Sequence, residues 1–380
     1  MAQRLKTDWT LFCTVILMVT FGLVIIYSAS SMIATLKYNL PSHYFLLRQA
    51  AWALVGFCAL MYFKRKDYRL LSAPHWAFVP MGLVLVMLLA VIFLDPLAHR
   101  WLRVGPLSLQ PSEFAKPALA IFLAWFITRR AAAINNVHTW LPAGLALLLL
   151  AGTVLVGDLG TAAVLAVTGA AVFYVAGLNR RYFILALTGG VLLAGFAVLA
   201  KPYRLGRIIG YVDPEFKLID KIDPAGRIKS YAHSTLSTRD PSYQARQSKI
   251  ALGSGGPLGL GLMQGKQKIL YLPEAHTDFI YAVIGEELGI WGCAGVLFAF
   301  LIILWRGLRL YFVAPDDFGR YLALSVTVTV AFQALINISV VLDLVPTKGI
   351  PLPMISHGGS SLLSTLMSLG ILLSVSEHTG

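Results

Sequence analysis

The chain has 380 residues, of which 57% are hydrophobic and only 13% are charged. Soluble domains carry roughly 25% charged residues, so this composition excludes an ordinary soluble fold. The formal net charge is +13, but most basic residues occupy short segments between apolar runs. That pattern reports orientation in a membrane and does not indicate a nucleic-acid partner.

The chain contains ten apolar runs that are long enough to cross about 30 Å of hydrocarbon as helices. We therefore expect an all-α polytopic membrane protein that forms one domain over residues 1–380. The expected spans are 11–31, 45–63, 76–95, 112–129, 139–156, 160–176, 182–200, 279–304, 321–341 and 359–376.

Basic residues mark one side of the predicted membrane. Short basic segments alternate in the correct order with the basic amino end, so the positive-inside rule places them and both termini in the cytoplasm. These segments are 64–69, 129–130, 180–181 and 305–320. The opposite segments are then external: 32–44, 96–111, 157–159, 201–278 and 342–358.

The largest external segment, 201–278, lies between the seventh and eighth spans. It carries twelve Lys or Arg residues against six acidic residues over 201–277, which predicts a negatively charged partner outside the membrane and makes Lys249 a candidate contact. Its part 213–243 is polar and interrupted by Pro and Gly, which predicts a mobile segment. The part 244–262 ends in five glycines, whose backbone amides either face an anion or simply make turns.

The eighth span is preceded by the stretch YLPEAHTDFIYAVIGEELG at 271–289. Thr277 or Asp278 is placed to cap a helix that begins at Phe279. A carboxylate at a membrane boundary is costly unless it is solvated, paired or used in function. On this stretch alone, a plain helix cap and a functional carboxylate both remain open for Asp278. Glu286 and Glu287 lie two turns deeper and are interpreted as structural.

Two more polar groups come from earlier external segments. In QPSEFAK (110–116), Glu113 and Lys116 form an i, i+3 pair that either fixes the helix end or lines a cavity with Lys116 available to an anion. In GDLGT (157–161), Asp158 either caps the sixth span or joins the same cavity.

The last external segment, with its flanks, reads DLVPTKGIPLPMISHGGSS (343–361), and its three prolines forbid a regular helix. Irregular backbone at membrane depth is tolerated where it lines a cavity, so Lys348, Ser356 and His357 are expected to face one. Gln333 and Asn337, one turn apart in the ninth span, are expected to join helices. Because polar features from several separate stretches fall on one predicted membrane face, we predict a functional site there.

The absence of several catalytic motifs limits the reactions that this site could carry out. No nucleotide-binding P-loop, zinc HExxH, serine GxSxG or dinucleotide glycine motif is present. A carboxylate among basic residues fits a lipid-linked substrate: the cations neutralise a diphosphate leaving group and the carboxylate takes a proton from an attacking hydroxyl. Glycosyl transfer from a polyprenyl diphosphate needs both functions, but a carrier that moves such a lipid without breaking bonds also fits.

Eight stretches carry a family resemblance. They are GLVIIYSASS (22–31), YFLLRQAAWALVG (44–56), QPSEFAK (110–116), GDLGTA (157–162), YRLGRIIGYVDP (203–214), ALGSGGPLGLGL (251–262), KILYLPEAHTDFIYAVIGEELG (268–289) and PTKGIPLPMISHGGSS (346–361). In order and spacing they resemble the SEDS family of shape, elongation, division and sporulation proteins, the FtsW/RodA/SpoVE group. The PTKG and HTDF-containing stretches are closer to the division members than to the elongation members.

This resemblance implies a ten-helix peptidoglycan glycosyltransferase in the bacterial cytoplasmic (inner) membrane, with its active site on the outer face. It implies that the enzyme polymerises lipid II, with Asp278 as the base for the acceptor 4-hydroxyl and undecaprenyl diphosphate as the leaving group. Glu113 and Lys116 would line the family's central cavity. The implied partners are a class B penicillin-binding protein, which crosslinks the new strands, and other membrane proteins of division or elongation.

Several hypotheses accompany this interpretation. The residues predicted to bind substrate are Glu113, Lys116, Asp158, Lys249, Lys348, Ser356 and His357. A divalent cation, Mg²⁺ or Mn²⁺, that bridges carboxylate and diphosphate is a further hypothesis, although the chain has no metal-ligand spacing. Two departures from the family pattern are a longer segment at 215–243 and His357 in place of a frequent aromatic residue. The rival functions are a lipid II flippase and a non-catalytic scaffold for the division machinery.

Overall fold

The structure, a computed structural model, describes residues 7–95, 99–105, 107–213, 223, 241–269 and 271–379. Each of the ten predicted spans coincides with a helix: α1 (Trp9–Tyr38), α2 (Tyr44–Arg65), α3 (Pro74–Leu94), α4 (Pro111–Arg130), α5 (Val137–Gly157), α6 (Leu159–Val175), α7 (Arg180–Leu199), α12 (Ile280–Val313), α13 (Asp317–Val341) and α14 (Gly359–Ser376). Smaller elements are η1 (Tyr68–Ser72), η2 (Ala131–Ala133), α8 (Pro202–Val212), α11 (Pro241–Gly255), and a hairpin of β1 (Leu102–Val104) and β2 (Leu107–Leu109).

Eight helices in the described part of the chain are long and apolar enough to cross a membrane. The other two predicted spans are α6, which is apolar but has 17 residues, and α4, which carries Glu113 in its first turn and two arginines in its last. The protein is therefore an all-helical, multi-pass membrane protein.

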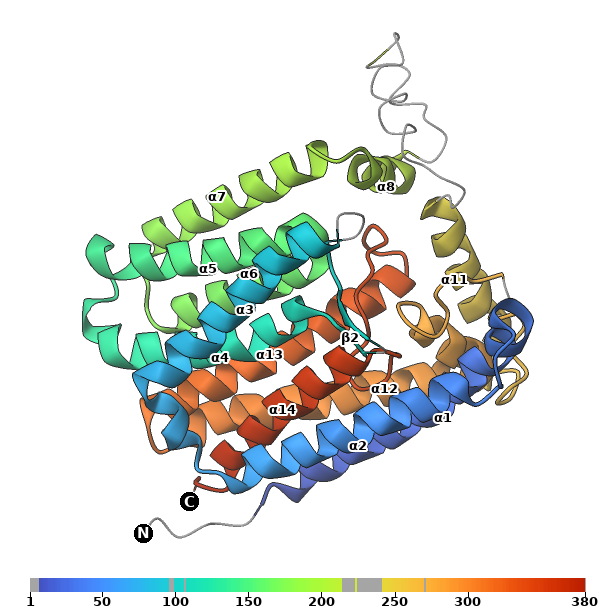
Figure 1. Ribbon diagram of the computed structural model, residues 1–380, viewed down its shortest axis with the longest axis horizontal. Helices are drawn as coiled ribbons and strands as arrows, with labels where there is room; N and C mark the ends of the chain where they lie inside the picture. The colour runs from blue at the N-terminus through green and yellow to red at the C-terminus, as the bar shows by residue number, and fades with distance from the viewer. Residues whose placement is uncertain are drawn as a thin grey trace.

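The long helices run between two ends of the molecule, and α8 and α11 lie at one of them (Figure 1). The opposite end holds both ends of the described chain. Lys64 Nζ lies 2.7 Å from Glu377 Oε1, and Arg306 Nε lies 2.7 Å from Asp8 Oδ2. The first pair fastens the end of α14 to α2, and the second fastens the start of α1 to α12.

The helices bury two apolar clusters. One is built mainly from α1, α2, α12, α13 and α14, and the other from α3, α4, α5 and α6. Helix α14 is the most enclosed of the spans, whereas α7 has no buried residue and exposes apolar side chains along its length. Exposed apolar faces of this kind are expected where a helix contacts lipid.

Helix α12 is kinked at Gly289, whose φ of 66° lies in the left-handed region that favours glycine. The turn after α11 packs into this kink: Ile290 N donates to Gly256 O, and Leu260 N donates to Glu286 O. The amides of Gly259 and Gly261 likewise donate to backbone carbonyls. Of the two alternatives that the sequence left open for the segment 244–262, turn formation is the one found at Gly259 and Gly261, because α12 and the end of α11 already accept the hydrogen bonds of these amides.

The segment 201–278, which is predicted to be external, contains α8 and α11. Residues 214–222 and 224–240 lie outside the described part of the chain, and so does most of the predicted mobile segment. Glu286 and Glu287 are structural, as expected. Glu286 accepts hydrogen bonds from the amides of residues 266 and 267, and Glu287 pairs with buried Lys268.

Candidate active site

Asp278 does not cap the eighth span. Helix α12 begins at Ile280, its N-cap residue is Phe279, and no side chain caps it. Within the described part of the chain, the Asp278 carboxylate accepts no hydrogen bond. The cap interpretation is wrong because the backbone stays in a turn through Asp278 and the helix starts later. The Asp278 carboxylate is therefore partly buried and has no hydrogen-bond donor among the described residues.

The turn that carries Asp278 is held by α13. Asn337 Nδ2 donates to Asp278 O at 2.8 Å and to Ile350 O at 2.7 Å. One amide group therefore fixes this turn against the proline-rich segment 343–358. The expectation that Asn337 joins helices is wrong: it binds two carbonyls of irregular backbone, which would otherwise be buried without donors.

Arg100 faces Asp278 across Gly349. Arg100 Nη2 donates to Gly349 O at 3.1 Å and to Asp158 Oδ2 at 2.8 Å. A methyl group at Gly349 would lie 3.0 Å from Asp278 Oδ2 and 3.5 Å from Arg100 Nη1. The backbone of Arg100 is anchored by Asp95, whose Oδ2 accepts its amide at 3.3 Å.

Sequence reasoning missed Arg100. Its backbone precedes the β1–β2 hairpin, which forms within the segment 96–111 that the sequence predicts to be external. A signal was present, because an arginine in a short segment predicted to be external runs against the positive-inside rule.

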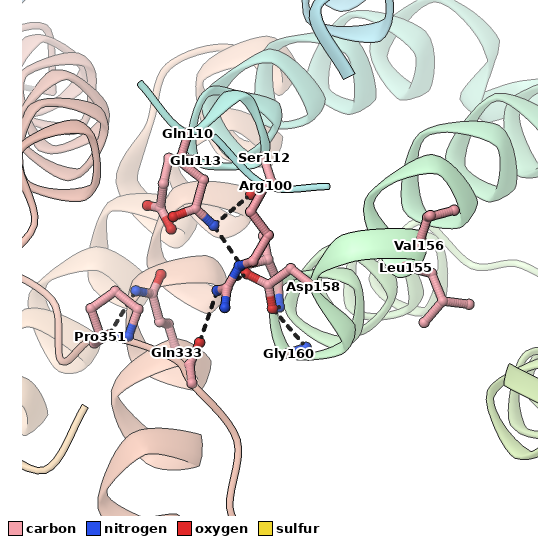
Figure 2. A network of polar contacts seen from close by, with 12 residues as sticks. Arg100, Gln110, Ser112, Glu113, Leu155, Val156, Asp158, Gly160, Gln333 and Pro351 are labelled. Carbon is pink, nitrogen blue, oxygen red and sulfur yellow. Dashed lines mark hydrogen bonds and ion pairs between the residues drawn. The ribbon is translucent and has the colours of Figure 1, made fainter. Parts of the chain in front are cut away.

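Asp158 caps α6, one of the two roles that the sequence left open, and it also binds Arg100. Its Oδ1 accepts hydrogen bonds from Gly160 N and Thr161 N, which caps α6. Its Oδ2 accepts from Arg100 and from Gln110 Nε2 at 3.1 Å, and Figure 2 shows Asp158 between these groups. Burial alone would raise the pKa of Asp158, but Arg100 and Thr161 outweigh it and hold the pKa below its usual value. The group is therefore an anion that holds Arg100 in place.

Glu113 and Lys116 form the predicted i, i+3 ion pair, with 2.6 Å between Lys116 Nζ and Glu113 Oε2. Lys116 Nζ also donates to Gln333 Oε1 at 2.6 Å, and Gln333 Nε2 donates to Pro351 O at 2.9 Å (Figure 2). Both charged side chains are buried. The chain of contacts runs from α4 through α13 to the proline-rich segment, so Gln333 joins helices as expected and also positions that segment.

The electrostatic surroundings of Asp278 differ from those of Asp158. Burial raises the pKa of Asp278 to about 7, against the opposing charge of Arg100 and with the support of Glu274. A carboxylate with a pKa near neutrality exchanges a proton readily at physiological pH, which suits a general base. Arg207, on α8, also lowers this pKa and donates to Thr347 O at 3.3 Å.

The proline-rich segment contributes three of the predicted residues. Ser356 Oγ accepts from Leu352 N and donates to Thr277 O, so it closes the segment against the turn before Asp278. Burial lowers the pKa of His357 to about 3, so its imidazole is neutral at physiological pH and supplies no charge for a diphosphate. Burial lowers the pKa of Lys348, while the charge of Asp158 opposes the shift.

Lys249 stands apart from this group. Its side chain is 58% exposed and its Nζ lies 2.6 Å from Asp343 Oδ2. Among the described residues, no set of three or more His, Cys, Asp or Glu side chains is arranged to hold a metal ion. The catalytic role of Asp278 stays a prediction, and so do the substrate-binding roles assigned to Glu113, Lys116, Asp158, Lys249, Lys348, Ser356 and His357.

The fold and this geometry define a class: a multi-pass helical membrane protein in which segments between the helices bring a carboxylate and a guanidinium group together at one end of the bundle. The family model "Cell cycle protein" (FtsW/RodA/SpoVE) matches residues 8–380, and the chain belongs to this family. A relative from Trichlorobacter lovleyi, named probable peptidoglycan glycosyltransferase FtsW, is 39% identical over 97% of this chain and 93% of its own length. Stage V sporulation protein E of Bacillus subtilis is 36% identical over 99% of both chains.

Solved structures give the same result. A chain of a peptidoglycan synthase complex, described as coordinating polymerization and crosslinking, superposes with a TM-score of 0.72 at 27% identity over 98% of both chains. The rod shape determining protein RodA of Thermus thermophilus superposes with a TM-score of 0.67 at 25% identity, again over 98% of both chains. The family membership predicted from the sequence motifs is thus confirmed.

Proposed function

We propose that this protein is a peptidoglycan glycosyltransferase that polymerises lipid II, acting in septal or lateral cell-wall synthesis, with the division role of the FtsW relatives favoured. The observation that carries the proposal is the Asp278 carboxylate, which caps no helix and accepts no hydrogen bond within the described part of the chain, yet faces Arg100 across Gly349. Family membership and the names of the FtsW relatives support the same activity.

In the proposed reaction, Asp278 accepts the proton of the acceptor's 4-hydroxyl as its oxygen attacks the anomeric carbon of the donor sugar. The bond from that carbon to the diphosphate breaks, the configuration inverts, and undecaprenyl diphosphate leaves with the electron pair. A base is most effective when its pKa lies near the working pH, and burial raises the pKa of Asp278 to about 7.

The leaving diphosphate requires positive charge that is already in place. Arg100, Arg207 and Lys348 supply it in this proposal. Asp158 holds Arg100 through Oδ2 at 2.8 Å, so the guanidinium does not need to reorganise when the diphosphate separates. The buried Glu113–Lys116 pair acts one step away, because Gln333 links it to the segment that carries Lys348.

The proposed setting is the bacterial cytoplasmic membrane, with both termini inside and Asp278 at the outer face. The proposed partner is a class B penicillin-binding protein, a transpeptidase that crosslinks the new strands. Support comes from the similarity to a chain of a complex that couples polymerization to crosslinking.

The test compares Asp278→Asn with Glu274→Gln, which removes a carboxylate from the same turn. Both full-length proteins are purified with the partner and given lipid II, and the glycan product is measured. We expect no polymer from Asp278→Asn, whereas Glu274→Gln should still form polymer, because the Glu274 side chain is exposed and hydrogen-bonds Thr277 of the same turn.

Thermal unfolding serves as the control for folding. If Asp278→Asn polymerises at the normal rate, Asp278 is not the base. In liposomes with labelled lipid II, translocation by the wild-type protein without any glycan product would assign a flippase instead.

A further inference from the structure

A cleft lies at the end of the molecule that holds both ends of the described chain. Its volume is about 340 Å³, within the range of small-ligand sites. It is formed by η1, the last turns of α4 and the start of α13, with a lining that includes Arg69, Ser72, Trp125, Arg129, Asp316 and Phe318. Helix α4 rises about 24 Å between Glu113 and Arg129, so the cleft is separate from the site around Asp278.

One cationic side chain of the cleft, that of Arg129, has no acidic partner among the described residues. Within the described part of the chain, the Arg129 side chain forms no ion pair, and its guanidinium carbon lies 5.3 Å from the centre of the Trp125 ring. The stacking holds the charge at the cleft. The hydroxyl of Ser72 makes no hydrogen bond to any described residue, so it is available as a donor.

The one acidic residue of this lining is already neutralised. Asp316 Oδ2 accepts from the Tyr68 hydroxyl and from Arg69 Nε at 3.3 Å, and its Oδ1 accepts from Gly319 N at 2.8 Å. Asp316 therefore orients Arg69, whose two terminal nitrogens are not used in this contact. The cleft presents two guanidinium groups to an anion.

An apolar surface continues from the cleft along the membrane. The Phe78 ring lies 4.9 Å from the Trp125 ring, edge to face. Phe78 is followed on α3 by Val79 and Leu83, which are 65% and 60% exposed. Arg and Trp beside an apolar helix face are typical of the membrane–water interface. A ligand that used both surfaces would need an anionic head and an apolar tail.

We propose that this cleft binds the phosphate headgroup of an anionic phospholipid, with Arg129, Arg69 and Ser72 on the phosphate and the acyl chain along α3. A phosphate between two arginines forms charge-assisted hydrogen bonds. Basic pockets between membrane helices bind lipid headgroups in this way. A free phosphate has the same head but would leave the exposed face of α3 unused.

Binding is measured on the full-length protein in neutral detergent by native mass spectrometry. The added probes are dioleoyl-phosphatidylglycerol, dioleoyl-phosphatidylcholine and inorganic phosphate. The variants are Arg129→Gln and its matched control Arg130→Gln, which removes the adjacent charge outside the lining of the cleft. Arg129→Lys tests whether charge alone restores binding.

We expect phosphatidylglycerol to bind more tightly than phosphatidylcholine, and Arg129→Gln to weaken it about fivefold, which corresponds to about 1 kcal/mol. Arg130→Gln should change it less than twofold, and Arg129→Lys should recover most of the loss. Equal losses in Arg129→Gln and Arg130→Gln would overturn the proposal, as would equal binding of the two lipids. Equally tight binding of inorganic phosphate would assign the cleft to a soluble phosphate compound instead of a lipid.

Discussion

Replacing Arg100 with Gln should move the pH dependence of polymerisation, and the size of the shift follows from the site. A methyl group at Gly349 would lie 3.0 Å from Asp278 Oδ2 and 3.5 Å from Arg100 Nη1, so these two atoms are at most about 6.5 Å apart, the sum of those distances. At about 6.5 Å, two unit charges interact by about 0.6 kcal/mol in water and about 2.5 kcal/mol at an effective dielectric constant of about 20. The corresponding change in pKa is about 0.5 to 2 units.

The sign of the shift is set by charge. The Arg100 cation favours the ionised form of Asp278 and lowers its pKa, while burial raises that pKa to about 7. Removing the cation therefore raises the pKa further, and the fraction of ionised base falls at any pH near neutrality. For a shift of about one unit, ionised Asp278 at pH 7.5 falls from about three-quarters to about one-quarter. High pH restores this threefold loss of rate, but it does not restore the loss of the Arg100 charge at the leaving diphosphate.

The assay is the initial rate of polymer formation from purified lipid II, with the partner present, at pH values from 5.5 to 9. Wild-type activity should decline as the pH falls through about 7, and the decline in Arg100→Gln should begin at higher pH. Arg100→Lys keeps the charge and should shift the profile less. If Arg100→Gln lowers the rate by the same factor at every pH, Arg100 does not act on the protonation of Asp278 and the reasoning is refuted.

Three further predictions address the same framework. Gly349→Ala should lower polymerisation at least tenfold with little change in thermal unfolding, because its methyl group would lie 3.0 Å from the Asp278 carboxylate; wild-type turnover would contradict this geometry. Glu287→Gln should lower the stability measured by thermal unfolding in detergent by about 3 to 5 kcal/mol, because it leaves Lys268 buried without its anion. Asp317→Asn, which breaks the exposed pair with Arg320, should change the same stability by less than about 1 kcal/mol. Equal effects of Glu287→Gln and Asp317→Asn would show that burial does not decide the strength of these ion pairs.

The sequence was sufficient for the architecture because crossing a bilayer is a local requirement. About 20 consecutive apolar residues mark a span wherever they occur, so every predicted span was found as a helix. The Glu113–Lys116 pair was equally accessible, because residues three apart on a helix are neighbours. The position of Asp278 at the boundary of a span was enough to single it out as a candidate. Only the structure shows that Asp278 does not cap the helix.

Only the tertiary structure decided which groups meet. Arg100 and Asp158 are far apart in the chain, and nothing in either local stretch indicates that the guanidinium joins Asp158 to Gly349. The glycines of 253–261 could be interpreted as an anion site or as turns, and the tertiary structure places the amides of Gly259 and Gly261 in hydrogen bonds to Gly255 O and Glu287 O, beside the kink at Gly289. Contacts of this kind depend on how helices from distant parts of the sequence pack, and local spacing carries no information about that packing.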